Sequence, residues 1–376
     1  MPLLISLLCA AMLLDAPAGR PPEGALDRYD PRAYNLRYEV TIATETLDRM
    51  PVRPQARRIA VEDTPIMFPL ILQSTFSEID LDSLTPRLLP DYVPDETISD
   101  RARIDDGLPL NQHLAVLPIE EFEGTAIRWE VGYDVKVWNS RINDEAAAGI
   151  AWPAEWPEEV RDALDPQQYI ESDAELFAQT VERVSEGRLR EITPYIAAKE
   201  LVRYSLLNLH VSSKGIIRRH DRAIVGLRIE GAEAAAQRGQ ASRPDVVNIC
   251  VAMLRSAGIP ARAVIGTRED PARRNKGEYD VWGEFYLPDT GWVPFDINEL
   301  RAQNLRALSV HEPWRGFGNL RNHNRRIPLA YHYLPPVTAQ SPQEPAIWGW
   351  DPRPATSQSL YQTINMRIRS HGRVEQ

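Results

Sequence analysis

Cysteine is scarce in this sequence: Cys9 and Cys250 are the only two among 376 residues. A scaffold held together by several disulfides is therefore excluded. The sequence also lacks the patterns of a metal-ligand cluster, a phosphate-binding loop, a serine-based catalytic triad and an internal repeat. We therefore expect no metal and no cofactor.

Positive charge is in deficit, because 43 lysine and arginine residues stand against 53 acidic residues and give a formal net charge of −10. An acidic protein has no general electrostatic reason to bind phosphate backbones, so we expect no nucleic-acid partner. Two arginine-rich stretches, 268–276 and 315–326, are local exceptions. We interpret each of them as a solvated loop.

No apolar run noted in the sequence is long enough for a stable membrane span. The run at the N-terminus, Leu3–Leu14, is shorter than the roughly 20 residues that a helix needs to cross a bilayer. Ala16-Pro17-Ala18 follows it with the small-x-small form of a secretory cleavage site, although no lysine or arginine precedes the run. We expect residues 1–18 to be a signal peptide and the protein to be exported, either to the periplasm or by secretion. Its removal would leave Cys250 as the only cysteine, with no internal disulfide.

Residues 30–145 are predicted to form a β-rich, sandwich-like domain. Apolar residues alternate with polar ones along two segments, as in strands that bury one face. The apolar residues are Leu36, Tyr38, Val40 and Ile42 in the first segment and Ile127, Trp129, Val131, Tyr133, Val135 and Val137 in the second. Trp129 and Tyr133 could also form a surface on which a ligand stacks. We expect them in the sandwich core instead.

Residues 165–376 are predicted to form a second, α+β domain. Helices are expected over 173–186, capped by Ser172, and over 194–207. Another is expected to begin near Arg243, because Ser242 and Asp245 form a pair like a capping box. Two strands near the C-terminus, with Trp348 and Trp350 in one and 364–368 in the other, are expected to close this domain.

Several motifs follow one another between Gly239 and Asp296. A helical segment, 246–255, ends in the turn Gly258-Ile259-Pro260-Ala261-Arg262, and a glycine-led entry, 239–245, precedes the helix. After it come Asp280-Val281-Trp282-Gly283-Glu284 and Gly291-Trp292-Val293-Pro294-Phe295-Asp296. In this order the motifs resemble the active-site core of transglutaminase-like cysteine proteins, which have a papain-like α+β fold. The resemblance implies an N-terminal β-domain as well.

The resemblance also implies a catalytic cysteine, histidine and aspartate at three positions, which here are occupied by Arg243, Asp280 and Asp296. Arginine has no nucleophilic lone pair, and an aspartate beside a cation is a poor proton donor near neutrality. We therefore expect a pseudoenzyme, with a vestigial cleft that binds a peptide or protein or serves only as a scaffold. We expect Arg243 to form an ion pair with Asp280 or Asp296, since an unpaired cation is unfavourable at a helix N-terminus.

Two enzymatic alternatives remain. An amide hydrolase, protease or acyltransferase could use Asp280, Glu284 or Asp296 as acid and base, provided that their pKa values are separated. Cys250 could instead be a displaced nucleophile, but its helical spacing places it on one apolar face, so we expect it in the core. The residues expected to line the cleft are Trp282, Glu284 and Trp292.

Overall fold

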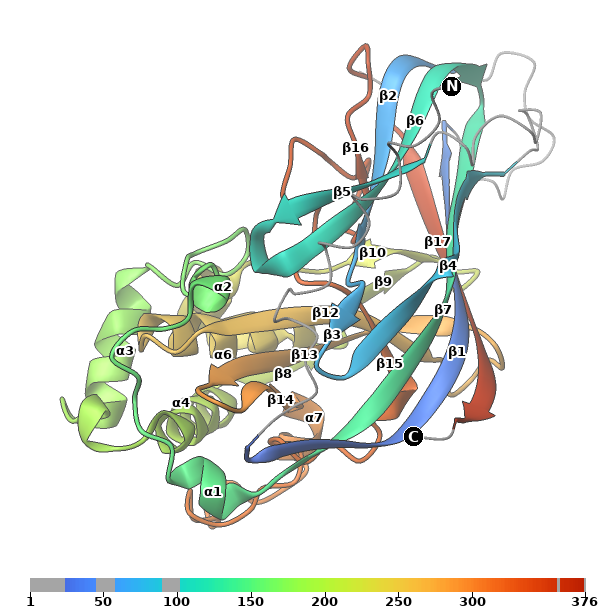
Figure 1. The fold of residues 1–376 in the computed structure, drawn as a ribbon. Coiled ribbons are helices and arrows are strands. Elements are labelled where there is room, and N and C mark those ends of the chain that lie inside the picture. The colour runs from blue at the N-terminus through green and yellow to red at the C-terminus, as the bar shows by residue number, and fades with distance from the viewer. Residues whose placement is uncertain (1–23, 45–57, 90–101, 357–358, 375–376) are drawn as a thin grey trace, which may run out of the picture.

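The computed structural model describes residues 24–44, 58–89, 102–356 and 359–374. The expected signal peptide, residues 1–18, lies outside these ranges. Within them, no helix is long and apolar enough to cross a membrane. The fold is mixed α+β, with β-rich sheets at the N-terminal side and most helices gathered at the opposite side (Figure 1).

The largest sheet has seven strands and is built around the long strands β1 and β7, which pair antiparallel. Its strand order is β3 (Gln73–Ser74), β4 (Ser77–Leu88), β7 (Ala126–Ile142), β1 (Leu26–Ala43), β17 (Tyr361–Arg373), β10 (Ile224–Leu227) and β9 (Ile216–Arg218). The two alternating segments of the sequence lie in β1 and β7, so the prediction of strands there is confirmed.

A four-stranded sheet packs on the first and completes a sandwich. Its order is β16 (Gly349–Trp350), β2 (Ile59–Leu70), β6 (Gln112–Gly124) and β5 (Arg103–Leu108). The Tyr38 and Phe68 rings lie 4.8 Å apart across the two sheets, and Trp129 meets Phe68 edge-on. Trp129 and Tyr133 are fully buried. The prediction that they belong to the core is therefore confirmed.

The C-terminal strands join the N-terminal sheets rather than the second domain. β17 pairs along its length with β1, and β16 pairs with β2. The expectation that these strands close the second domain's own sheet is therefore wrong. Ile364, Met366 and Ile368 of β17 are buried, and pairing beside β1 places them in the core.

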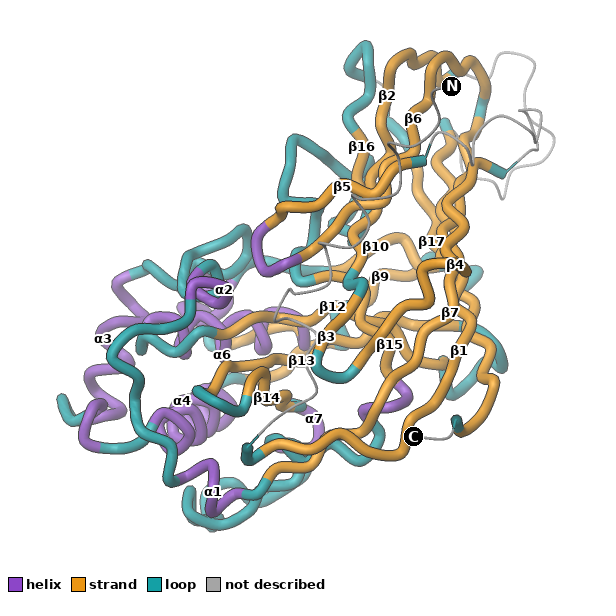
Figure 2. Tube along the Cα trace, in the orientation of Figure 1, coloured by secondary structure: helices purple, strands orange, loops and turns teal. Residues whose placement is uncertain are grey.

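The third sheet and the helices form the part of the molecule that carries the site. The sheet order is β14 (Gly291–Phe295), β13 (Gly277–Leu287), β12 (Ala261–Glu269) and β15 (Arg326–Ala330), and a small parallel pair joins β11 (Gln240–Ser242) to β8 (His210–Ser213). The central helix α6 (Arg243–Ser256) packs against β12 and β13 on one side and helices α3 (Glu175–Ser185), α4 (Pro194–Asn208) and α5 (Ala232–Arg238) on the others. Figure 2 shows these helices grouped together.

The described residues also form six other helices and three 3₁₀ turns. They are α1 (Asp144–Ala148), α2 (Glu158–Arg161), α3 (Glu175–Ser185), α4 (Pro194–Asn208), α5 (Ala232–Arg238) and α7 (Ile297–Arg301), with the 3₁₀ turns η3 (Pro109–Asn111), η4 (Leu189–Glu191) and η5 (His323–Arg325). The two predicted helices, 173–186 and 194–207, correspond to α3 and α4. Ser172 does not cap α3, because residues 172–174 form a turn and Ala174 is the N-cap.

Candidate functional site

The candidate site begins at the N-terminus of α6, where Ser242 is the cap. Ser242 Oγ accepts a hydrogen bond from the Asp245 N–H at 3.3 Å, and Asp245 Oδ1 accepts from the N–H groups of Glu230 and Gly231. The predicted helix start is thus confirmed, and the cap is tied to the chain that leads into α5. This arrangement places Arg243 at the first helical position.

The three positions implied by the sequence motifs come together around this helix end. Arg243 and Asp280, which lies in β13, both line a small cavity of about 10 Å³. Arg243 and Asp296 both line a neighbouring open cavity of about 980 Å³. Asp296 directly follows β14 and caps α7, because its Oδ1 accepts from the N–H groups of Asn298 and Glu299.

The cation that pairs with both aspartates is Arg326, not Arg243. Arg326 Nε lies 3.3 Å from Asp280 Oδ2, and Arg326 Nη2 donates to Asp296 Oδ2. Among the described residues, no ion pair within 4 Å joins Arg243 to either aspartate. The expected pairing of Arg243 is therefore wrong: Arg326, buried at the start of β15, occupies the space between the two carboxylates.

This position of Arg326 also corrects the interpretation of the second arginine-rich stretch. Residues 315–326 were expected to form a solvated loop, but Arg326 is buried against Asp280 and Asp296. In the first stretch, Arg268 is half-buried at the end of β12 and reaches Glu278 at 3.2 Å and Asp280 at 3.8 Å. Both stretches thus supply charged side chains to the site.

The pKa values of the two aspartates shift in opposite directions. Burial raises the pKa of Asp280, and the nearby Arg326 and Arg268 only partly oppose it. Burial also acts to raise the pKa of Asp296, but Arg326 and the backbone donors of α7 outweigh it and leave this pKa below the ordinary value. Asp296 therefore carries a firmly held negative charge, whereas Asp280 is the more readily protonated of the two.

His323 is a histidine near the site that the sequence reasoning did not single out. It lies in η5 and is buried between two aromatic rings, with centroid distances of 5.4 Å to Trp282 and 5.2 Å to Phe76. Burial, followed by the charge of Arg326, lowers the pKa of His323 to about 3. Such an imidazole is neutral at physiological pH and too weakly basic to replace a catalytic histidine. No local pattern in the sequence indicates that His323 or Arg326 lies close to Asp280 and Asp296 in the folded chain.

The three residues expected to line the cleft are buried. Trp282 packs beside the site, with its ring centroid 5.9 Å from the Arg326 guanidinium, whereas Glu284 and Trp292 pack around Arg262. Trp282, Glu284 and Trp292 are each at most 5% exposed. Glu284 Oε2 lies 2.7 Å from Arg262 Nη2, and the Arg262 guanidinium is sandwiched between Trp292 at 3.9 Å and Tyr331 at 3.8 Å. None of the three lines either cavity beside Arg243. A buried ion pair with stacked rings gives Glu284 a structural role.

Cys250 lies in the core, as its helical spacing indicated. Its side chain is fully buried, and burial raises the pKa of the thiol to about 12. A thiol with such a pKa holds almost no thiolate at neutral pH, and the thiolate is the reactive form.

We expect Cys250 to react slowly with a thiol reagent in the folded protein and rapidly after denaturation. Cys250→Ala should lower the free energy of unfolding by about 1 kcal/mol through lost contacts. The labelling rate of native protein at neutral pH is the measurement. Labelling of the native form as fast as that of the denatured form would contradict the buried position.

Comparison with known proteins bears on the segment just described. Residues 188–297 match the Transglutaminase-like superfamily. This part of the chain is a transglutaminase-like superfamily domain. It contains α4, α5, α6 and the strands β12, β13 and β14, of which β13 carries Asp280, and it ends one residue after Asp296.

The fold is also similar to that of a solved structure described as a "putative cysteine protease" from Cytophaga hutchinsonii. The TM-score is 0.54 at 12% identity, with 93% of each chain covered. A "putative protease" from Parabacteroides distasonis matches with a TM-score of 0.21 at 10% identity, over 69% of this chain and 63% of that chain. No curated protein matches. The first similarity extends over nearly the whole chain and concerns the fold alone.

The described residues contain no group of three or more histidine, cysteine or acidic side chains arranged to hold a metal ion. What the site does contain is charge. Arg243, Arg268 and Arg326 surround Asp280 and Asp296, and a guanidinium can bind and orient an anion but cannot attack a carbonyl.

Proposed function

We propose that the transglutaminase-like domain of this protein is catalytically inactive and that its cleft binds a peptide or protein ligand. The observation that carries the proposal is the identity of the residue at the start of α6. The sequence motifs place the nucleophile there, and this chain has Arg243. Arginine stays protonated and has no lone pair with which to form an acyl intermediate.

The surroundings of Asp280 support the same proposal. The sequence motifs place the catalytic base at this position, where Asp280 contacts Arg326 at 3.3 Å and Arg268 at 3.8 Å. The two guanidinium groups hold the Asp280 carboxylate in ion pairs. The residue at the start of α6 is Arg243, so Asp280 also has no thiol beside it to activate. Cys250, fully buried with a raised pKa, does not replace the missing nucleophile. The N-terminal sequence supports export as the setting in which the cleft meets its ligand.

A carboxylate enzyme is the second candidate, and one observation favours it. The pKa values of Asp280 and Asp296 are shifted apart, upward for Asp280 and downward for Asp296. Separation of this kind is what an acid and a base in one active site need. Both groups are engaged by Arg326, however, and Glu284 is held by Arg262, so we rank this candidate second.

The test is an assay of the purified chain without residues 1–18 against peptide, amide and glutamine-donor substrates. We expect no turnover above background, because the chain has no activated nucleophile. A cooperative melt confirms that the assayed protein is folded. Restoring the two residues in Arg243→Cys/Asp280→His gives at most a trace of activity, since catalytic geometry depends on supporting contacts that this chain has replaced.

Turnover by the unmodified protein would contradict the proposal, and variants would then identify the mechanism. Loss of that turnover in Asp280→Asn would favour the carboxylate enzyme, and loss in Cys250→Ser would favour a displaced thiol. Glu130→Gln is the matched control, because it alters a buried carboxylate that is ion-paired with Arg87 in the sandwich, away from the site. It should leave any turnover unchanged.

A further inference from the structure

The larger cavity beside Arg243 is strongly cationic in a protein that is acidic as a whole. Eight arginines and four carboxylates line this space of about 980 Å³, whereas the formal charge of the whole chain is −10. Concentration of one sign of charge in a cavity focuses the electrostatic field there and attracts ligands of the opposite sign. The sign of the cavity therefore indicates an anionic ligand.

Several of these arginines are not neutralised by the protein itself. Among the described residues, no hydrogen bond or ion pair engages the guanidinium groups of Arg243, Arg274 and Arg325, all three of which line the cavity. Arg274 and Arg325 are exposed, and Arg243 is half-buried. They are available to a ligand without the loss of an existing pair.

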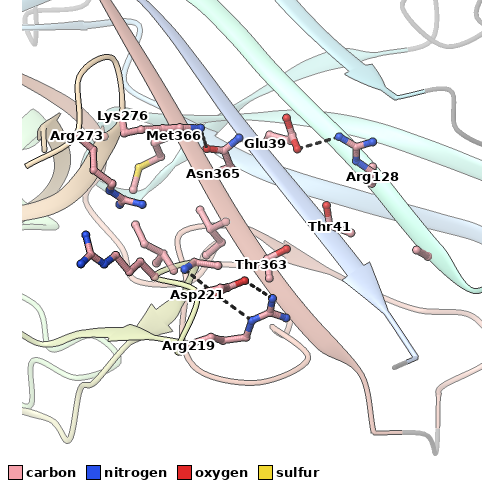
Figure 3. A pocket seen from close by; sticks show the side chains of 16 residues that line it. Glu39, Thr41, Arg128, Arg219, Asp221, Arg273, Lys276, Thr363, Asn365 and Met366 are labelled. Carbon is pink, nitrogen blue, oxygen red and sulfur yellow. Dashed lines mark hydrogen bonds and ion pairs between the residues drawn. The ribbon is translucent and has the colours of Figure 1, made fainter. Parts of the chain in front are cut away.

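A second pocket differs from the larger cavity in how its cationic side chains are paired. The pocket of about 540 Å³ between β1, β17 and the 219–223 turn also has cationic side chains, but all of them except Arg222 have local partners among the described residues (Figure 3). Arg219 pairs with Asp221, Arg128 with Glu39, and Lys276 Nζ donates to Asn365. Arg273 lines both spaces and pairs with Asp270. The unpaired positive charge is thus concentrated in the larger cavity.

Arg326, which lines the larger cavity, has a buried donor without an acceptor among the described residues. Arg326 uses Nε toward Asp280 and Nη2 toward Asp296, but its Nη1 is buried with no hydrogen-bond partner among the described residues. Arg326 is 8% exposed and lines the cavity. A buried donor without a partner is costly, and its positive charge adds to the field that attracts an anion to the cavity.

Arg243 gives a further indication. An unpaired cation at a helix N-terminus opposes the helix dipole, and no carboxylate of the described chain pairs with it. A side chain that violates a local stability rule without a compensating contact is expected at a functional position. An anion bound at this helix end would be stabilised both by Arg243 and by the dipole.

We propose that this cavity binds an acidic peptide segment, with its carboxylates held by Arg243, Arg274 and Arg325. The inference rests on the proposed non-catalytic cleft and adds the chemistry of its ligand. Guanidinium groups match carboxylates in bidentate geometry. Single-stranded nucleic acids are a poorer fit, because Tyr34 is the only aromatic residue that the described part of the chain places in the lining, and their bases bind by stacking.

The test is fluorescence anisotropy of a labelled oligoglutamate peptide with the mature chain, compared with labelled oligoglutamine. We expect binding of oligoglutamate alone, weakened by added salt. Arg243→Gln/Arg325→Gln should weaken it by about tenfold or more, as expected when charged hydrogen bonds are removed. The rim variant Arg274→Gln/Arg325→Gln should weaken it as well without altering α6.

Arg161→Gln is the matched control, because Arg161 is exposed in α2 and lines neither space. It should bind oligoglutamate as the unmodified protein does, and thermal melts should show that all variants are folded. Absence of oligoglutamate binding, or equal weakening by Arg161→Gln, would overturn the inference. So would tighter binding of a labelled oligonucleotide or sulfated glycan with the same dependence on Arg243 and Arg325.

The outcome also separates this inference from the proposed function. Oligoglutamate binding together with peptide turnover would refute the non-catalytic cleft and retain the anion site. No binding together with silence in the activity assays would refute the anion site and retain the non-catalytic cleft.

Discussion

Replacing Arg326 by methionine should lower the free energy of unfolding by about 3–5 kcal/mol, the loss that follows when one partner of a buried ion-pair network is removed. Arg326 contacts both Asp280 and Asp296, which are 7% and 1% exposed. Without it, two carboxylates share a buried space with no cation between them. Chemical denaturation at neutral pH measures the difference.

Two comparisons make this prediction specific. Arg326→Met/Asp280→Asn should recover part of the loss, because one of the two uncompensated charges is then absent. Arg87 is also an ion-pair partner of a buried carboxylate, Glu130, but the Arg87 side chain is 45% exposed. Arg87→Met should therefore lower the free energy of unfolding by no more than about 1 kcal/mol. Equal losses in Arg326→Met and Arg87→Met would show that Arg326 does not hold the two aspartates.

Acidification from neutral pH to about pH 4.5 should destabilise the protein through two buried histidines. Burial lowers the pKa of His323 to about 3 and that of His332 to about 4, from an ordinary value of 6.5. The unfolded chain therefore takes up protons before the folded one does. The stability that each neutral histidine contributes is fully present above pH 6.5. It is lost as the pH falls toward the pKa of that histidine in the folded protein. At about pH 4.5 this amounts to roughly 2–3 kcal/mol for each histidine.

His323→Phe isolates this effect from that of other groups. The raised pKa of Asp280 acts in the opposite direction, since its protonation favours the folded state on acidification. Phenylalanine retains an aromatic ring between Trp282 and Phe76 and does not titrate. The variant should lose roughly 2–3 kcal/mol less than the unmodified protein between neutral pH and about pH 4.5. His311→Phe, at an exposed position, is the control. Identical acid losses in all three proteins would exclude His323 as a source.

Local sequence patterns predicted much of the fold because the forces involved are local. Alternation along β1 and β7 follows from burying one face of a strand, and the start of α6 follows from the Ser242 cap. Cys250 was predicted to be buried from spacing along a single helix. Each prediction needed only residues within about two helical turns or one strand of each other.

The site was predicted only in part. The motifs indicated the positions 243, 280 and 296, and the chain brings these residues to the same pair of cavities. The motifs did not indicate which charges pair, because an arginine that lies 30 residues after Asp296 along the chain returns through β15 to hold both aspartates. The burial of Glu284 and Trp292 likewise depends on Tyr331, which packs on the opposite side of the Arg262 guanidinium.

The sequence by itself determined the residue chemistry: no thiol at the start of α6, no histidine in β13, and a cap that fixes where the helix begins. Only the tertiary structure decided which partners those residues have. It paired β17 with β1, more than 300 residues away, and placed Arg326 between Asp280 and Asp296. The reason is physical. Backbone propensity and side-chain period act between neighbours in the chain, whereas ion pairing and sheet order depend on distances that exist only after the chain has folded.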